Sequence, residues 1–580
     1  MAIFLLAIGV KRFVERQMAK KHRSPLEYVA LTSLALLVAA IAKYPNRAIF
    51  TRARPDLKEI TAEGHPLFGN LLQALTSKEN PLIVLHKAFQ KRGDIYVITV
   101  PYRGRFFLVN NPMYIEYILK TNFNNYIKGS VFGDQLRDIL GNGIFVSDQD
   151  AWRFHRKTAS NIFTTKMYRQ LTEGAFTDSA RDLCSIFDKA ESLSQPVDLQ
   201  QLFLRLTMDA FGKLTFGIEF NSLLTEGRNE FGDAFDYLTA NVDGRVINPL
   251  WPIFDRLTPG KIGKLKKAIA VLDRYAYSAV HKRRAETEEE RVKRPRDLLD
   301  HFINHVREDG SMLSDLELRD VFVNFMIAGR DTTALTLTWQ FYCLMANPRI
   351  LKNVLKELDI VLQGSEIYTY ETMMQELPYL KAVFHETLRL YPQVPRNAKE
   401  CVADDVLPDG TVVYKGELVA FSTYAMGRNR GVWGEDAEVF CPERWLVDEE
   451  DVVKHGSSSA TPLTPPQQQQ GSSMKGVSPF GKFKMESQFK FNSFNANPRL
   501  CLGQTFATLE AMVTSCMLLQ KFDFKLVPGQ PIPEPKPSAT LPMLNPLMTF
   551  TTRKQHNKSS TTTTTSRSGD SSLSSSYISV

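Results

Sequence analysis

The chain has 580 residues, of which 43% are hydrophobic and 23% are charged, and its formal net charge is +8. This composition is ordinary for a globular protein with a large core. The positive charge is modest and is concentrated in the first 54 residues. It therefore argues against nucleic-acid binding and favours contact with a membrane surface or an acidic protein partner.

The N-terminal segment, residues 1–54, is predicted to be a membrane anchor with a basic flank. Two apolar runs, 2–10 and 28–42, are separated by six basic residues. The first run is too short to cross a bilayer. The second, extended back to Pro25, gives about 18 residues, just enough for about 30 Å of hydrocarbon. No small-residue cleavage site follows, which favours a retained anchor over a removed signal peptide. A buried N-terminal helix is the alternative, and the basic flanks on both sides leave the orientation open.

Residues 55–553 are predicted to form one catalytic domain, because no linker or repeat interrupts residues 60–445. Apolar residues recur at helical spacing from 112 to 347, and residues 94–100 and 105–109 have the pattern of a strand pair. Short strands are expected near 412–421 and 522–527. The fold class is therefore mainly α with a small β portion. A low-complexity insertion at about 450–489 and a Ser/Thr-rich tail, 554–580, have too few apolar residues to fold.

One of the six cysteines, Cys501, has neighbours that indicate chemistry. It lies in the stretch 491–503, immediately before an amphipathic helix predicted at 504–520. The start of a helix offers free N–H groups and a positive dipole end, which lower the pKa of a thiol and favour the thiolate that an iron ligand requires. Gly503 would let the backbone lie close to a flat ring, and Phe494 could stack against it. Arg499 could pair with a haem propionate.

This stretch resembles the haem-binding loop of the cytochrome P450 family, Phe-x-x-Gly-x-Arg-x-Cys-x-Gly. The chain departs from it once, because the family's glycine is Asn497 here. Asparagine is the next-best residue for a left-handed backbone, at a cost of about 1 kcal/mol relative to glycine. We expect a slightly strained loop that still holds haem. The alternative is a degenerate, non-catalytic haem-binding membrane protein.

A long central helix is predicted from a capping box at Ser314–Glu317 to Ala346. Its length is about 33 residues, or about 50 Å. In its middle stands Ala-Gly-Arg-Asp-Thr-Thr, residues 328–333. Gly329 is a poor helix former, and the Thr332 hydroxyl can bond the carbonyl four residues back. We therefore expect a local opening of the helix there, with room for dioxygen above a haem.

Asp331 and Thr332 supply an acid and an alcohol that are suited to relaying protons to dioxygen. In the cytochrome P450 family the matching stretch is the oxygen-binding segment. The resemblance therefore implies a catalytic role for these two residues. It also implies a haem-thiolate fold in which this helix lies over the haem.

Two further groups of residues match family motifs. Glu386 and Arg389, at i and i+3 on a predicted helix, resemble the Glu-x-x-Arg motif that is completed by Arg444, and the implied role is structural. A second group is expected to approach the haem propionates. Its members are Trp152 and Arg156, which share one helix face, and Lys399, where the family commonly has an arginine.

The resemblance implies a monooxygenase that inserts one oxygen atom from O2 into a lipophilic substrate. Residues 328–333 and 494–504 look like the eukaryotic branch that hydroxylates long-chain fatty acids and alkanes, at or near the chain terminus. Arg245 is a candidate partner for a substrate carboxylate. The alternatives are hydroxylation of a steroid or other ring-shaped lipid, and a haem-thiolate isomerase acting on hydroperoxides. The intact Asp331–Thr332 pair disfavours the isomerase.

The implied cofactor is haem b, with electrons from NADPH through an external flavoprotein reductase, because the sequence has no nucleotide-binding motif of its own. We expect the reductase to dock on a basic face near Cys501 made by Arg499, Lys490, Lys484 and Lys482. The family resemblance places the catalytic domain on the cytosolic side of the endoplasmic reticulum.

Overall fold

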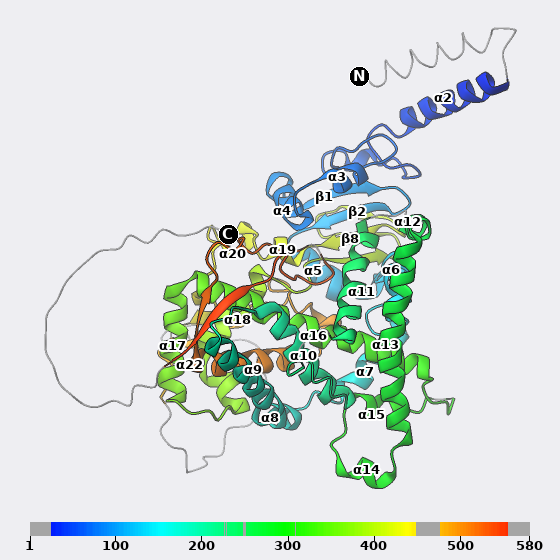
Figure 1. Ribbon diagram of the computed structural model, residues 1–580. Helices are drawn as coiled ribbons and strands as arrows, with labels where there is room; N and C mark the ends of the chain where they lie inside the picture. Colours follow the sequence, from blue (N-terminus) through cyan, green and yellow to red (C-terminus); the bar gives the residue numbers. More distant parts are fainter. Residues whose placement is uncertain are drawn as a thin grey trace, which may run out of the picture.

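The computed structural model describes residues 25–225, 227, 229–247, 251–307, 309–447, 476–536 and 538–554. The first apolar run, most of the predicted insertion and the predicted tail lie outside these ranges. The second apolar run forms helix α2 (Pro25–Lys43), which leads away from the body at its α3 end (Figure 1). By length and composition α2 could cross a membrane, and it has no buried residue.

The β portion of the protein is a five-stranded sheet next to α2, in the order β1-β2-β8-β5-β3. Strands β1 (Ile95–Val100) and β2 (Gly104–Val109) are antiparallel and are joined by a tight turn, as predicted. Strand β8 (Leu418–Phe421) pairs parallel to β2, and β5 (Asn397–Cys401) joins β8 to β3 (Tyr126–Ile127). Helices α3 (Leu71–Thr76) and α4 (Pro81–Arg92) lie beside β1 and β2 (Figure 1).

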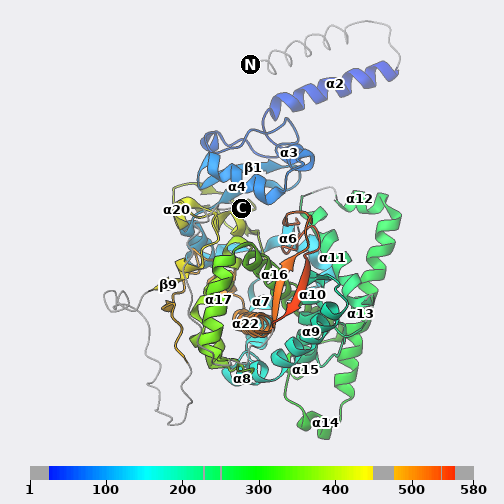
Figure 2. The same cartoon turned by 60° about the vertical axis from the view of Figure 1, so that its left-hand side comes forward.

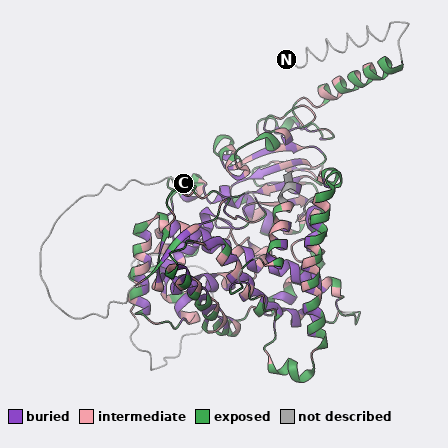
Figure 3. Cartoon of the chain, viewed as in Figure 1, coloured by how far each residue is buried: buried purple, intermediate pink, exposed green. Residues whose placement is uncertain are grey.

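Helix α16 (Asp315–Ala346) runs through the middle of the helical part in both views (Figures 1 and 2). It has 32 residues, and Ser314 and Glu317 form the predicted capping box at its start. Most of its side chains are buried, because helices pack around it on all sides (Figure 3). A helix with this little exposed surface is stabilised by tertiary packing on every face rather than by a single apolar stripe.

The other helices surround α16 or connect it to the sheet. They are α5 (Pro112–Glu116), α6 (Gly129–Leu140), α7 (Gln149–Ser160), α8 (Thr165–Glu173), α9 (Ala175–Ser192), α10 (Leu199–Phe216), α11 (Glu230–Ile247), α12 (Trp251–Leu257), α13 (Pro259–Ala285), α14 (Glu288–Lys293), α15 (Leu298–Ile303), α17 (Pro348–Leu362), α18 (Pro378–Leu390), α19 (Thr423–Met426), α20 (Arg430–Trp433) and α22 (Gln504–Lys521).

The remaining strands form small sheets. Strand β11 (Phe522–Leu526) continues directly from α22 and pairs with β12 (Met548–Arg553), which also pairs with β4 (Val197–Asp198). The pairs β6 (Asp405–Val406) with β7 (Val412–Val413) and β9 (Leu446–Val447) with β10 (Lys482–Phe483) are two residues long. The mainly helical fold class with a small β portion is confirmed.

Candidate active site

The Cys501 loop is held by backbone hydrogen bonds at the start of α22. The Cys501 N–H donates to the Phe494 carbonyl oxygen at 2.8 Å. The Leu500 carbonyl oxygen accepts from the Arg156 guanidinium at 2.5 Å. Gly503 is the N-cap of α22, so the cysteine lies two residues before it, as the sequence predicts.

The expected lowering of the Cys501 pKa is wrong for the protein by itself. Enclosure by protein raises the pKa of the thiol above its ordinary value, and the Gly503 backbone amide and the Arg156 charge offset this only in part. The sequence argument counted the helix N-terminus and omitted the desolvation of the thiolate, which is the larger effect.

Asn497 adopts a left-handed backbone conformation, with φ of +48°. This conformation is predicted from the sequence, because Asn497 stands where the family motif has a glycine. Its N–H donates to the Gln488 side-chain oxygen at 2.7 Å, which fixes the turn from outside the loop. Asparagine is among the few residues with a side chain that tolerate this region of φ and ψ. The departure from the family pattern is therefore accommodated by the loop.

The middle of α16 contains the expected hydrogen bond but no break. The Thr332 hydroxyl donates to the Ala328 carbonyl oxygen at 2.6 Å. The helix nevertheless continues without interruption, so the predicted local opening is not found. The structure gives a different reason for Gly329: a Cβ there would lie 2.1 Å from the Phe211 ring of α10. The glycine permits close packing of two helices.

Protein atoms leave one face of this region uncovered. Ile327, Ala328 and Thr332 are only partly buried, whereas their neighbours on α16 are buried. Cys501 is exposed. Of the described residues beyond its own chain neighbours and helix backbone, a Cβ added to Gly503 would meet only the Cys501 sulfur within 4 Å, at 3.9 Å. These features suit a flat group lying against the Cys501 loop, because that loop has no side chain at position 503 to block it.

The residues predicted to contact propionates gather in one place. The Trp152 ring stacks under the Arg499 guanidinium at 4.1 Å, and Arg156 lies 5.9 Å from the same ring. Arg499 also donates to Asp148 at 2.9 Å. Lys399 is fully buried, and its Nζ has no hydrogen-bond partner within the described part of the chain.

This cluster carries more positive than negative charge, with Asp148 paired to Arg499. Burial, together with Lys128 and Arg499, holds the pKa of Lys399 well below its usual value, and Asp148 offsets this only in part. Burial also lowers the pKa of Lys128 to about 8 and that of Arg499 to about 10. A buried ammonium without a partner is costly. The arrangement therefore fits a ligand carrying two carboxylates, as haem does. The sequence analysis missed Lys128 and Asp148, since neither lies in a recognised motif.

Asp331 is buried and forms an ion pair that the sequence analysis did not expect. Arg330 donates to Asp331 at 2.9 Å and to Asp236 of α11 at 2.7 Å. Burial raises the pKa of Asp331 to about 6, and Arg330 opposes this shift. A carboxyl group with such a pKa can both release and accept a proton near neutral pH.

Comparison with known proteins decides the family. The family model of cytochrome P450 matches residues 61–550. The chain belongs to the cytochrome P450 family.

Several curated proteins are similar along most of their length. Cytochrome P450 monooxygenase cyp1 of Mycosarcoma maydis is 35% identical over 536 residues, covering 88% of this chain and 77% of the relative. Cytochrome P450 704B1 of Arabidopsis thaliana is 34% identical over 505 residues, with 80% and 90% covered. Cytochrome P450 86B1 of the same plant is 35% identical over 497 residues, with 80% and 82% covered. Membership implies a haem monooxygenase with an external redox partner.

In this cytochrome P450, Glu386 is the centre of a buried network behind the Cys501 loop. Its carboxylate accepts two hydrogen bonds from Arg389, both at 2.8 Å, and one from Arg444 at 3.0 Å. The Cys441 N–H and the Trp445 indole N–H also donate to it, at 2.7 and 2.9 Å. Although burial favours the neutral acid, the two arginines hold the pKa of Glu386 below its usual value. The predicted trio therefore exists, with two donors that the motif did not reveal.

A second carboxyl group of this cytochrome P450, Glu510 on α22, was missed by the sequence analysis. It is 2% exposed, neither of its carboxyl oxygens has a hydrogen-bond partner among the described residues, and the Thr333 hydroxyl of α16 lies nearby. Burial raises the pKa of Glu510 to about 8, and Thr333 offsets this slightly. The sequence feature that could have revealed Glu510 is its place as a single glutamate in the largely apolar run 506–513, where a charged residue is rarely tolerated.

Proposed function

We propose that this cytochrome P450 hydroxylates a long-chain fatty acid at or near its terminus. The observation that carries the proposal is the resemblance of residues 328–333 and 494–504 to the fatty-acid and alkane branch of the family. The partly uncovered Ile327 and Ala328 side chains, one turn before Thr332, add an apolar surface suited to a methylene chain. Hydroxylation of a steroid or other ring-shaped lipid is the alternative.

Arg245 does not serve this proposal as a carboxylate partner. It is 2% exposed and donates to Asp138 at 2.8 Å and to Asp255 at 3.2 Å. Its guanidinium also stacks on Trp251 at 4.3 Å. Two carboxylates already neutralise its charge, so a third would gain little.

The proposed roles of the site residues follow from their contacts. Cys501 is the ligand of the haem b iron, and Gly503 and Phe494 lie against the ring. Trp152, Arg156, Lys399 and Arg499 hold the propionates, with Asp148 sharing the charge of Arg499. Bound haem supplies the activation of dioxygen. Asp331 and Thr332 hold and transfer protons on the α16 side, while Glu386, Arg389 and Arg444 keep the Cys501 loop in place.

Electrons are proposed to come from NADPH through a flavoprotein reductase at the endoplasmic reticulum membrane, with α2 as the anchor and the catalytic domain facing the cytosol. The predicted docking face needs one correction. Arg499 is largely buried and paired with Asp148, so it cannot contact a partner. Lys482 and Lys484 are exposed, and Lys490 is partly exposed beside Glu486. These three lysines are the proposed docking residues.

The first test is the reduced carbon-monoxide difference spectrum of the wild type and of Cys501→Ala. A strongly red-shifted Soret band that is lost in Cys501→Ala, but kept in the control Cys441→Ala, supports thiolate ligation by Cys501. Turnover with reductase, NADPH and a panel of fatty acids and steroids then identifies the substrate class. Hydroxylated steroid without hydroxylated fatty acid would refute the fatty-acid proposal and leave the monooxygenase intact.

A further inference from the structure

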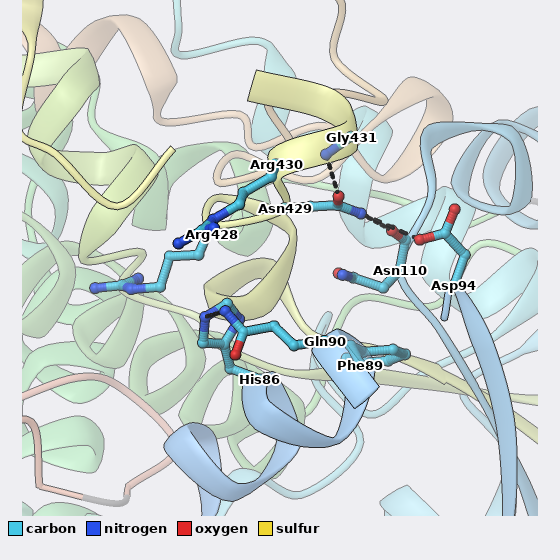
Figure 4. Close-up of a pocket in the computed structure, with 9 residues that line it drawn as sticks. All are labelled: His86, Phe89, Gln90, Asp94, Asn110, Arg428, Asn429, Arg430 and Gly431. Atoms are coloured by element: carbon cyan, nitrogen blue, oxygen red, sulfur yellow. Dashed lines mark hydrogen bonds between the residues drawn. The ribbon is translucent and has the colours of Figure 1, made fainter. Parts of the chain in front are cut away.

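A cavity whose lining residues are remote in sequence from the Cys501 loop lies where α4, the β1–β2 pair and the start of α20 meet (Figure 4). Its volume is about 460 Å³. Helix α4 contributes one wall, the residues flanking the β1–β2 pair contribute another, and the turn from Arg428 to Gly431 contributes a third. This size is within the range of small-molecule sites.

One end of the cavity carries a buried positive charge without a counter-ion. Arg428 is 3% exposed, and its guanidinium donates to two backbone carbonyl oxygens, those of Leu390 and Tyr424. It also stacks on the Tyr424 ring at 3.7 Å. Within the described ranges no carboxylate lies within ion-pair distance of it. Carbonyl groups solvate a cation but do not neutralise it, so an anion in the cavity would be stabilised.

His86 adds an unused donor at the same end. Gln90 Nε2 lies 3.1 Å from His86 Nε2 and 3.1 Å from a Glu438 oxygen. With the Gln90 amide N–H as the donor, His86 Nε2 accepts and the proton of the neutral ring is on Nδ1, while the Glu438 carboxylate lies farther away, 3.7 Å from Nε2. Burial and the charge of Arg428 lower the pKa of His86, which favours the neutral ring, and the Glu438 carboxylate opposes this shift only in part. His86 is 7% exposed, and Nδ1 has no partner among the residues that the structure describes.

The opposite end of the cavity is rich in acceptors. Asn110 is 3% exposed, and its side-chain oxygen has no donor from the described chain. The Asp94 carboxylate lies beside it and accepts from Asn111 at 2.8 Å and from Asn429 at 3.3 Å. Figure 4 shows Arg428, Arg430 and His86 on one side and Asn110 with Asp94 on the other. The cavity is therefore polarised, with donors at one end and acceptors at the other.

We propose that this cavity binds the phosphoethanolamine group, as a free molecule or as the head of a phospholipid. The phosphate accepts from Arg428, Arg430 and the His86 Nδ1–H, and the primary ammonium donates to Asn110 and Asp94. One ligand thus satisfies His86 Nδ1 and the Asn110 side-chain oxygen, which have no partner among the described residues, and brings an anion to the buried Arg428 and a cation to Asp94. A lipid source is compatible with the position of the cavity, because α4 and β1 lie at the end of the body from which α2 departs (Figures 1 and 2).

The test uses the full-length holoprotein in phosphatidylcholine nanodiscs, titrated calorimetrically with O-phosphoethanolamine, phosphorylcholine and inorganic phosphate. We expect saturable one-to-one binding of phosphoethanolamine, with weaker binding of phosphorylcholine, whose quaternary ammonium has no N–H to donate. Arg430→Gln should weaken the binding of phosphoethanolamine and of phosphate about tenfold, because one charge-assisted contact is lost. Asp94→Asn should weaken the binding of phosphoethanolamine, whose ammonium it contacts, but not the binding of phosphate.

Arg430 suits this test because its side chain is 57% exposed and its carboxylate contacts are loose, both at 3.7 Å. The matched control is Arg553→Gln, which removes an arginine of 52% exposure on β12. An unchanged Soret band in each variant shows that the fold is intact. The proposal is overturned if phosphoethanolamine gives no saturable heat, or if Arg430→Gln binds as tightly as the wild type and Arg553→Gln.

Nanodiscs that contain phosphatidylethanolamine distinguish a lipid head group from free phosphoethanolamine as the ligand. If the lipid head group fills the cavity, the free ligand no longer binds in these discs although it binds in phosphatidylcholine discs. If the free ligand binds equally in both, the soluble molecule is the ligand. Neither outcome depends on catalysis, so a failure here is distinct from a failure of the proposed hydroxylase function.

Discussion

The Arg330 guanidinium donates to the Asp331 carboxylate at 2.9 Å and to Asp236 at 2.7 Å with the same nitrogen. Arg330 is 3% exposed, whereas the Asp236 side chain is 44% exposed. The buried acid of the proposed oxygen-binding segment is thus linked through one arginine to a carboxylate at the surface. A group held in this way keeps its position next to Thr332 while it changes protonation state.

Asp331→Asn should lower kcat by about 10²-fold or more with little change in KM, because it removes a proton donor and keeps the shape of the side chain. Burial raises the pKa of Asp331 to about 6. The rate of the wild type should therefore change with pH around 6, and this limb should disappear in the variant. Steady-state rates from pH 5 to 8, with a solvent isotope effect, provide the measurement.

Asp315→Asn is the matched control for this prediction. Asp315 lies in the first turn of the same helix and pairs with Arg284 and His281 near the surface. Its removal should leave the pH profile of kcat unchanged. If Asp331→Asn kept a wild-type rate and isotope effect, Asp331 would have no part in proton transfer.

Glu386→Gln should reduce the free energy of unfolding by about 3–5 kcal/mol, because it removes the carboxylate that pairs with the buried Arg389 and one of the two that pair with Arg444, whose other partner is Asp436. Glu386 is fully buried. Denaturant unfolding of the holoprotein and the yield of haem-loaded enzyme measure the effect. Glu230→Gln breaks an exposed pair with Arg274 and should leave the free energy of unfolding nearly unchanged. Equal effects of the two substitutions would contradict a structural role for Glu386.

The sequence was sufficient for features that depend on local spacing. The capping box of α16, the β1–β2 hairpin and the position of Cys501 before α22 follow from neighbouring residues, and each prediction is confirmed. The prediction of a left-handed backbone at Asn497 is also confirmed, because a positive φ depends on the residue type and on the turn in which it lies.

Features that depend on packing between distant segments could not be predicted. Gly329 is explained by Phe211 of α10, more than a hundred residues earlier, and not by a local opening of α16. The pKa of Cys501 is raised mainly because the protein around the sulfur desolvates the thiolate, although the residue itself is exposed, and no pattern within the loop reveals this effect. Arg245 looked available in the sequence, but Asp138 and Asp255 surround it once α6, α11 and α12 are assembled.

Asn497→Gly should raise the free energy of unfolding by about 0.5–1 kcal/mol, because glycine adopts a positive φ without steric cost. The hydrogen bond to Gln488 is retained, since it uses the backbone N–H. Asn497→Ala should lower the stability by a similar amount, as alanine tolerates φ of +48° less well than asparagine. Denaturation midpoints of the three proteins measure the order. A glycine variant less stable than the alanine variant would contradict the strain argument.

Glu510→Gln should remove a pH dependence of stability that the wild type shows at neutral pH. Burial raises the pKa of Glu510 to about 8 in the folded protein, above its ordinary value of 4.5. The folded state therefore binds the proton more tightly than the unfolded state. The resulting stabilisation is complete below pH 4.5 and is lost as the pH rises through 8.

The measurement is the free energy of unfolding of the wild type minus that of Glu510→Gln, from pH 4 to 9. This difference should decline steadily between pH 4.5 and 8. The variant therefore becomes more stable relative to the wild type as the pH rises. Glu357 and Asp331 also titrate in this range, with a pKa of about 7 and about 6. Both are present in the two proteins and cancel in the difference. The corresponding difference for Asp331→Asn should level off about two pH units earlier, because its folded-state pKa is lower by that amount. A flat profile for Glu510→Gln would mean that this carboxylate is already ionised in the folded protein, with a counter-charge that supports it.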